Sequence, residues 1–342
     1  LTDSDETLNA GWYVVNGEVN CNNVLTAEGN VHLILTDNCL LNASKGIRVA
    51  EGNSITIYAQ SEGENIGKLT AKGFRGEAAG IGGYEPNESN GPITIHGGNI
   101  TAEGNMYGPG IGGACGGNGK DIIINGGVVT AIGGNRGYGA GIGGASINSS
   151  NPAVGRGYNI TINGGIVNAT GKTYGAGIGG AYGDGTDITI NGGTVIATGG
   201  SFGAGIGGGD NGAGKNIIIN GGTVTAHSSS SSAGIGGGIR GEGTNITING
   251  GIVDAKGASG IGGGDNAKGS NIVINNGTVT AKGTSGAGIG SGGGDGTDIY
   301  INGGTVTAVG ISTGIGGAGL ADKSGNGTDI HIKNAVVEAS SQ

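Results

Sequence analysis

The sequence predicts an all-β fold: a single-stranded right-handed parallel β-helix of about ten three-sided coils, each of about 28 residues. Gly-Ile-Gly recurs at intervals of 26–36 residues, and a block resembling Ile-Thr-Ile-Asn-Gly-Gly-Thr-Val-Thr-Ala lies between successive copies. The composition also supports a β-helix, because 88 of 342 residues are glycine and only 4% are aromatic. Such a chain suits a thin core of small aliphatic side chains better than a layered globule. The central isoleucines of the signature are Ile81, Ile111, Ile142, Ile178, Ile206, Ile235, Ile261, Ile289 and Ile315.

Each repeat contains three short strands and three turns. Residues 188–190 alternate isoleucine with threonine, so both isoleucines share one face. Residues 191–193 are Asn-Gly-Gly, which tolerate positive φ and predict a tight turn. A second strand follows at 194–197 and a third at 204–207. No window shows the 3.6-residue apolar period of a helix, so each repeat is one triangular coil.

The two ends of the chain differ from its middle. Residues 1–27 lack the repeat, and we expect them to form an N-terminal cap over a β-helix that spans residues 28–342. A cap is needed because an open β-helix end is a sheet edge that invites aggregation. Residues 28–60 read as irregular early coils, and residues 330–339 as a degraded terminal coil.

Two rows of polar residues recur once in each coil. One row follows the first strand and is mostly asparagine, including Asn163, Asn191 and Asn220. The other precedes that strand and alternates Asp with Asn, from Asp121 to Asp329. Stacked amides can form hydrogen bonds along a β ladder, and Asp or Asn can stabilise turns. We therefore interpret both rows as structural.

Charge and cysteine content exclude several function classes. The net charge of −9 and a pI near 4.8 argue against nucleic acid as a partner, because phosphate binding needs clustered Lys and Arg. No apolar run is long enough for a membrane helix, so we expect no membrane insertion. Cys21, Cys39 and Cys115 do not make a disulfide framework. Whether Cys21 and Cys39 form a bridge stays open, as does the oligomeric state.

The repeat blocks, joined by Ala-Gly-Ile-Gly-Gly, resemble secreted bacterial proteins of the pectate-lyase-like β-helix class. They are similar in particular to Gly-rich carbohydrate-binding β-helix modules of Gram-positive anaerobes, over roughly residues 28–340. The resemblance implies an extracellular protein, secreted or attached to the cell surface, with a polysaccharide or a glycoprotein glycan as partner. That class also includes adhesins, lyases and glycoside hydrolases, but no catalytic signature of the pectate lyases or polygalacturonases is present.

Departures from the repeat mark the candidate binding site. Four residues before the signature isoleucine, successive coils carry Tyr107, Tyr138, Tyr174 and Phe202. Two residues earlier, a polar row consists of Arg75, Asn105, Arg136 and Lys172. Equal parity directs both rows to the same side of an extended chain. The rows therefore fit a sugar-binding platform, but an aromatic ladder packed on itself would give the same pattern.

Other functions remain open on the same scaffold. Asp184, Asp187 and Asp210 are the candidate carboxylates for a glycoside hydrolase or polysaccharide lyase, although Asp is common in Gly-rich turns for backbone reasons. The four histidines have no metal-ligand spacing, so we expect no cofactor, with structural calcium in the turns as an open alternative. Outward threonine pairs such as Thr223 and Thr225 leave an ice-binding protein as a further alternative.

Overall fold

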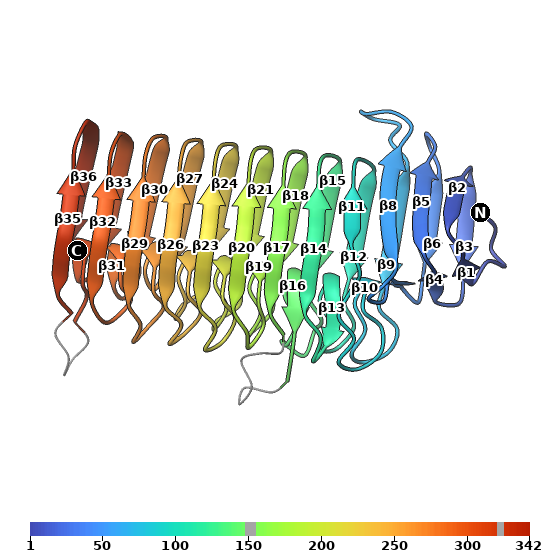
Figure 1. The fold of residues 1–342 in the computed structure, drawn as a ribbon, viewed down its shortest axis with the longest axis horizontal. Helices are drawn as coiled ribbons and strands as arrows, with labels where there is room; N and C mark the ends of the chain where they lie inside the picture. The colour runs from blue at the N-terminus through green and yellow to red at the C-terminus, as the bar shows by residue number, and fades with distance from the viewer. Residues whose placement is uncertain (148–154, 320–324) are drawn as a thin grey trace.

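Three parallel sheets form an elongated β-solenoid, shown by a computed structural model that describes residues 1–147, 155–319 and 325–342. Each sheet contains 12 strands within these residues, and the chain visits sheets A, B and C in turn. Figure 1 shows the coils side by side along the long axis, with the two termini at opposite ends. The fold class predicted from the sequence is confirmed.

The strands of sheet A are short, with two to five residues each. They are β1 (Thr7–Leu8), β4 (Leu25–Ala27), β7 (Ile47–Arg48), β10 (Ile81–Gly82), β13 (Ile111–Cys115), β16 (Ile142–Ala145), β19 (Ile178–Gly179), β22 (Ile206–Gly207), β25 (Ile235–Gly236), β28 (Ile261–Gly262), β31 (Ala287–Gly290) and β34 (Thr313–Gly316).

Sheet B contains longer strands. They are β2 (Gly11–Val15), β5 (Asn30–Leu35), β8 (Ser54–Ala59), β11 (Ile93–Ile95), β14 (Gly119–Ile124), β17 (Gly157–Ile162), β20 (Gly185–Ile190), β23 (Gly214–Ile219), β26 (Gly243–Ile248), β29 (Gly269–Ile274), β32 (Gly296–Ile301) and β35 (Gly327–Ile332).

Sheet C completes each coil. Its strands are β3 (Glu18–Cys21), β6 (Leu40–Ala43), β9 (Lys68–Lys72), β12 (Asn99–Glu103), β15 (Val128–Ile132), β18 (Ile166–Thr170), β21 (Thr194–Thr198), β24 (Thr223–His227), β27 (Ile252–Gly257), β30 (Thr278–Gly283), β33 (Gly304–Gly310) and β36 (Ala335–Ser341). We call the connections between the sheets the A–B, B–C and C–A corners.

The core is a continuous stack of aliphatic side chains along the rod axis. In one central coil, sheet A contributes Ile206, sheet B contributes Ile217 and Ile219, and sheet C contributes Val224 and Ala226. Each is at most 1% exposed, and the same pattern repeats in the neighbouring coils. The period-2 alternation of the sequence therefore sets the inward and outward faces of every coil.

Residues 1–27, which we predicted to be a cap, hold β1 to β4 and so contribute a strand to every sheet. Leu8 and Val15 are fully buried in this first coil. Only the residues before β1 fold over its open end, where the Leu1 amino group donates a hydrogen bond to the Val14 carbonyl (2.9 Å). Strands β1 to β4 were harder to recognise from the sequence, because they use Leu and Val without the Gly-Ile-Gly signature.

Both polar rows form the expected ladders. In the asparagine row, Asn191 Nδ2 donates to Asn163 Oδ1 and Asn220 Nδ2 donates to Asn191 Oδ1, each at 2.7 Å. In the Asp/Asn row, every residue from Asp121 to Asp329 has a φ of 50–55°. Asp and Asn tolerate this left-handed conformation better than other non-glycine residues, which explains the composition of the row.

Among the described residues there is no helix, and none therefore that could span a membrane. The three cysteines are buried and free, so Cys21 and Cys39 are not bridged.

Candidate functional site

The structure gathers the four predicted aromatic residues into one column at the C–A corner. Tyr107 contacts Tyr138 edge-to-face, with ring centroids 5.6 Å apart. Tyr138 stacks on Tyr174 at 5.0 Å, and Tyr174 stacks on Phe202 at 5.4 Å. All four side chains are half-buried. The coil spacing thus places the rings at distances that favour aromatic pairing.

A fifth ring, which sequence analysis missed, closes this column from the A–B corner. Tyr182 stacks on Tyr174 at 4.8 Å and on Tyr138 at 5.8 Å, and it is only 8% exposed. Burial raises the pKa of its phenol well above the ordinary value. Its φ of 60° is left-handed, a conformation that later coils give to Asn211 and Asn266 at the same corner. The sequence holds no signal for it, because Tyr182 lies outside the predicted row.

These contacts limit what the aromatic column can bind. Tyr138 and Tyr174 each pack against three other rings, so neighbouring side chains occupy the faces that a sugar would need. Backbone bonds tie the same corner to the A–B corner: Asp210 N donates to Tyr174 O (3.0 Å) and Ile239 N donates to Phe202 O (3.2 Å). The geometry therefore favours the packing interpretation of the column.

The polar row divides into two kinds of residue. Arg75 Nη1 lies 2.7 Å from Glu85 Oε1, and its guanidinium lies 6.0 Å from the Tyr84 ring centre. Asn105 holds a turn, since Nδ2 donates to Phe74 O (2.5 Å) and Oδ1 accepts from Met106 N (2.8 Å).

Arg136 and Lys172 have freer side chains. Arg136 is exposed, and none of the ion pairs among the described residues involves either cation. These two residues are therefore the members of the row that remain available to a ligand.

A polar hollow of about 280 Å³ lies beside this row, and we call it the corner hollow. It is lined by Lys72, Glu103, Gly104, Asn105, Ile132, Gly133, Asn135 and Lys172. Lys72 Nζ lies 3.3 Å from Glu103 Oε2. The hollow is thus lined by two ammonium groups, one carboxylate and two amides around a single aliphatic side chain, which is a polar composition suited to a hydroxyl-rich ligand. The Asn105 amide and the Lys72–Glu103 pair already have partners in the protein, whereas Lys172 has no ion-pair partner among the described residues.

The three candidate carboxylates occupy different environments. Asp187 belongs to the Asp/Asn row, where its Oδ1 accepts from Asn216 Nδ2 (2.9 Å). Asp184 Oδ1 accepts from Ala213 N (2.8 Å), while its Oδ2 lies 3.5 Å from Arg156 and 3.6 Å from Lys215. Both groups therefore already have structural partners.

Asp210 lies instead beside the aromatic column, where it is 9% exposed. Burial raises the pKa of its carboxyl, against the opposing charge of Arg240 and the Asn211 backbone N–H. No described group of three or more His, Cys, Asp or Glu side chains is arranged to hold a metal ion.

The outward threonine pairs lie in register on sheet C, but the row is interrupted. Thr223 and Thr225 of β24 pair with Ile252 and Asp254 of β27, and the threonines resume in β30. The long insertion at 145–158 falls partly outside the described residues.

Comparison with known proteins identifies the repeat itself. The sequence matches a family model described as beta helix repeat over residues 93–117, 122–146, 160–182, 188–210, 217–239, 246–265, 272–293 and 299–319, together more than half of the chain. The chain belongs to the beta helix repeat family. No curated protein and no solved structure matches it.

The beta helix repeat segments begin at residue 93, so the family match leaves out the first coils. Those coils, together with His96 near the start of the first matched segment, hold a second aromatic group that sequence analysis missed, on the outer face of sheet B. Trp12 stacks on His32 with centroids 4.3 Å apart, and Tyr58 stacks on His96 at 4.9 Å. Trp12 and Tyr58 lie 5.4 Å apart, joining the two pairs. The available signal was the alternation of residues 31–35 and 55–58, which directs His32 and Tyr58 outward.

Proposed function

We propose that this beta helix repeat protein is a non-catalytic carbohydrate-binding module that works outside the cell and binds an acidic glycan in the corner hollow. The observation that supports this most is the gathering of Lys72 and Lys172 around amide side chains in one hollow, in a chain whose net charge is −9. Ammonium, guanidinium and amide groups donate hydrogen bonds to sugar carboxylates and hydroxyls, and charge-assisted bonds are the stronger ones.

The surrounding structure supports the proposal by holding the hollow rigid. Lys72, Glu103 and Ile132 are the last residues of β9, β12 and β15, so the sheet fixes their spacing. The adjacent aromatic column stiffens the corners that carry Arg136 and Lys172. Binding groups placed on rigid elements lose little conformational entropy when a ligand binds.

Calorimetry with oligogalacturonides and hyaluronan oligosaccharides tests this function. Lys172→Ala should weaken binding about tenfold, the effect of losing one charge-assisted hydrogen bond. Lys282→Ala is the control, because Lys282 is an exposed lysine near the same end of the sheet C strands, at the fifth position of β30, but in a distant coil. It should leave affinity unchanged.

The same glycans also test the absence of catalysis. Chromatography of each mixture should recover intact oligosaccharide, whereas new reducing ends or unsaturated products would show an enzyme. Equal loss of affinity in Lys172→Ala and Lys282→Ala, or no binding by the unmodified chain, would contradict the proposed site.

A further inference from the structure

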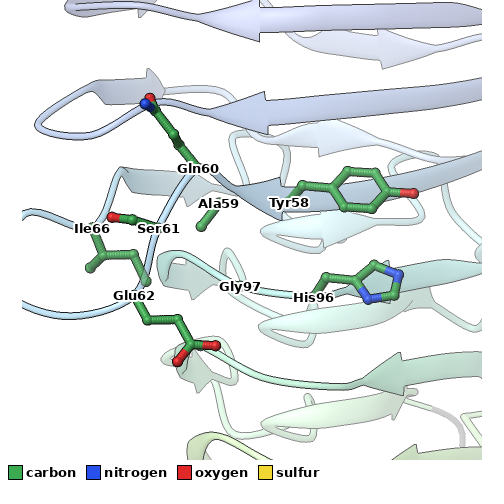
Figure 2. A pocket seen from close by; sticks show the side chains of 9 residues that line it. Tyr58, Ala59, Gln60, Ser61, Glu62, Ile66, His96 and Gly97 are labelled. Atoms are coloured by element: carbon green, nitrogen blue, oxygen red, sulfur yellow. The ribbon is translucent and has the colours of Figure 1, made fainter.

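A second hollow, of about 200 Å³, lies at the B–C corner of the early coils. Its wall is the connection after β8, which projects beyond the neighbouring corners in Figure 1. Figure 2 shows Tyr58 and His96 side by side at one end of the hollow and Glu62 on the connecting loop. The lining is Tyr58, Ala59, Gln60, Ser61, Glu62, Ile66, His96, Gly97 and Gly127.

The loop that forms this wall is held by the preceding coil. Ser61 Oγ donates to Asp37 Oδ1 (2.6 Å), and Gln60 Oε1 accepts from Asp37 N (3.2 Å). Glu62 is exposed, and its side chain takes part in none of the hydrogen bonds or ion pairs among the described residues. A fixed hollow thus offers polar loop groups and one uncommitted carboxylate beside the stacked Tyr58–His96 pair, whose rings are inclined by only 5°.

The two hollows lie at opposite ends of the same sheet C strands. Gly127, which lines the B–C hollow, immediately precedes β15, and Ile132, which lines the corner hollow, ends it. Five residues of extended strand separate them by about 16 Å. Thr70, Thr101 and Thr130 lie in register midway along β9, β12 and β15 on the outer face. Their hydroxyls give this stretch of sheet C a polar, hydrogen-bonding surface.

We infer that the Tyr58–His96 hollow is a second saccharide subsite, and that one glycan chain crosses sheet C over β9, β12 and β15 to reach both hollows. This inference rests on the proposed function and adds the direction and composition of the ligand. The Glu62 carboxylate accepts hydrogen bonds from hydroxyls and repels a uronate, so this subsite takes an uncharged sugar. The cations at the corner hollow take the acidic sugar. The ligand is therefore a glycan that contains both kinds of unit.

Binding measurements on hyaluronan oligosaccharides of increasing length test the inference, because this polymer alternates a uronic acid with an uncharged amino sugar derivative. Affinity should rise with length until the chain reaches both hollows and then stay constant. Oligogalacturonides, in which every unit is acidic, should show no such rise. Fluorescence of Trp12, the single tryptophan, should change only with the long hyaluronan fragments, since Trp12 lies 5.4 Å from Tyr58.

Variants of the exposed loop separate the two subsites without disturbing the core. Glu62→Ala should lower the affinity for long hyaluronan fragments about tenfold and leave the shortest fragments unaffected. Glu62→Lys should increase the affinity for long oligogalacturonides. Glu64→Ala is the matched control, because Glu64 is an exposed carboxylate of the same loop that does not line this hollow.

The possible failures are distinguishable. Length-independent binding that Lys172→Ala weakens and Glu62→Ala leaves unchanged would overturn the second subsite while the proposed function stands. Absence of binding by the unmodified chain to every oligosaccharide would overturn both.

Discussion

The second glycine of each Gly-Ile-Gly signature lets adjacent coils approach closely. Gly207 has a φ of 132°, a conformation that L side chains rarely adopt, and a Cβ added there would lie 2.0 Å from the Gly236 carbonyl oxygen. Equivalent glycines in neighbouring coils show the same conformation and the same contact. The signature is therefore a requirement of coil stacking.

Gly207→Ala should lower the free energy of unfolding by about 3–5 kcal/mol, because the methyl group meets backbone that cannot move independently. Gly76→Ala is the control: its Cβ would lie 3.7 Å from the nearest atom, Met106 Sδ. Thermal and urea unfolding of both variants measure the difference. Equal stability would contradict the backbone contact.

Asp210 gives the stability of the protein a pH dependence. Its carboxyl pKa is raised above the ordinary 3.8, chiefly by burial, so the folded state binds the proton more tightly than the unfolded chain does. The contribution of the Asp210 carboxyl to the free energy of unfolding is fully present at pH values below its pKa in the unfolded chain. This contribution is lost as the pH rises through its pKa in the folded protein.

Asp210→Asn should therefore stabilise the protein at neutral pH, and the gain should vanish in acid. Urea titrations at a series of pH values provide the measurement. Asp187→Asn is the comparison, since Asp187 lies in the exposed Asp/Asn row, and a similar pH-dependent gain there would argue against burial as the cause.

At the scale of elements, the aromatic column joins two corners that the short strands of sheet A leave close together. Tyr182 from one corner stacks on Tyr174 from the other, and Asp210 N is bonded to Tyr174 O. The sequence pattern alone fitted both a sugar platform and a packed ladder. Tyr182 favours the packed ladder, because it covers rings that the platform would expose.

Tyr174→Ala should lower the free energy of unfolding by about 2–4 kcal/mol, through lost burial and lost stacking on three rings. Phe74→Ala should change it by less than about 0.5 kcal/mol, since Phe74 is 58% exposed. Denaturant unfolding compares the two. A fully stable Tyr174→Ala variant that had lost only glycan affinity would restore the platform hypothesis.

At the scale of the whole molecule, the two ends of the rod differ in how their cores are covered. In the first coil Leu8 and Val15 are fully buried beneath the N-terminal residues. In the last coil Ile332, which pairs in register with the fully buried Ile301, is 49% exposed. Because each coil contacts only its neighbours, local stability should follow this difference.

Hydrogen exchange should therefore be faster in β34–β36 than in β1–β3, although both groups of strands lie at an end of the solenoid. Mass spectrometry of peptides from both ends, with β20–β24 as the protected reference, measures it. Equal protection at the two ends would show that the residues before β1 contribute little to covering the core.

Much of this molecule could be predicted from periodicity. The spacing of the Gly-Ile-Gly signature predicted three-sided coils, and the position of Asn163, Asn191 and Asn220 predicted a ladder that the structure contains. The first coils were harder, because Leu8 and Val15 lie in strands without the signature. The candidate site was predictable only in its composition, since the position of Lys172 gives no information about what faces it.

The sequence by itself determined which residues lie inside and outside each coil, because a period-2 strand and a fixed coil length leave one register in which the aliphatic side chains stack. Only the tertiary structure decided which side chains meet at the corners. Corner residues are far apart in sequence and become neighbours through the closing of the coil, so the contact between Tyr182 and Tyr174 and the hollows at opposite ends of β15 appear in no local pattern.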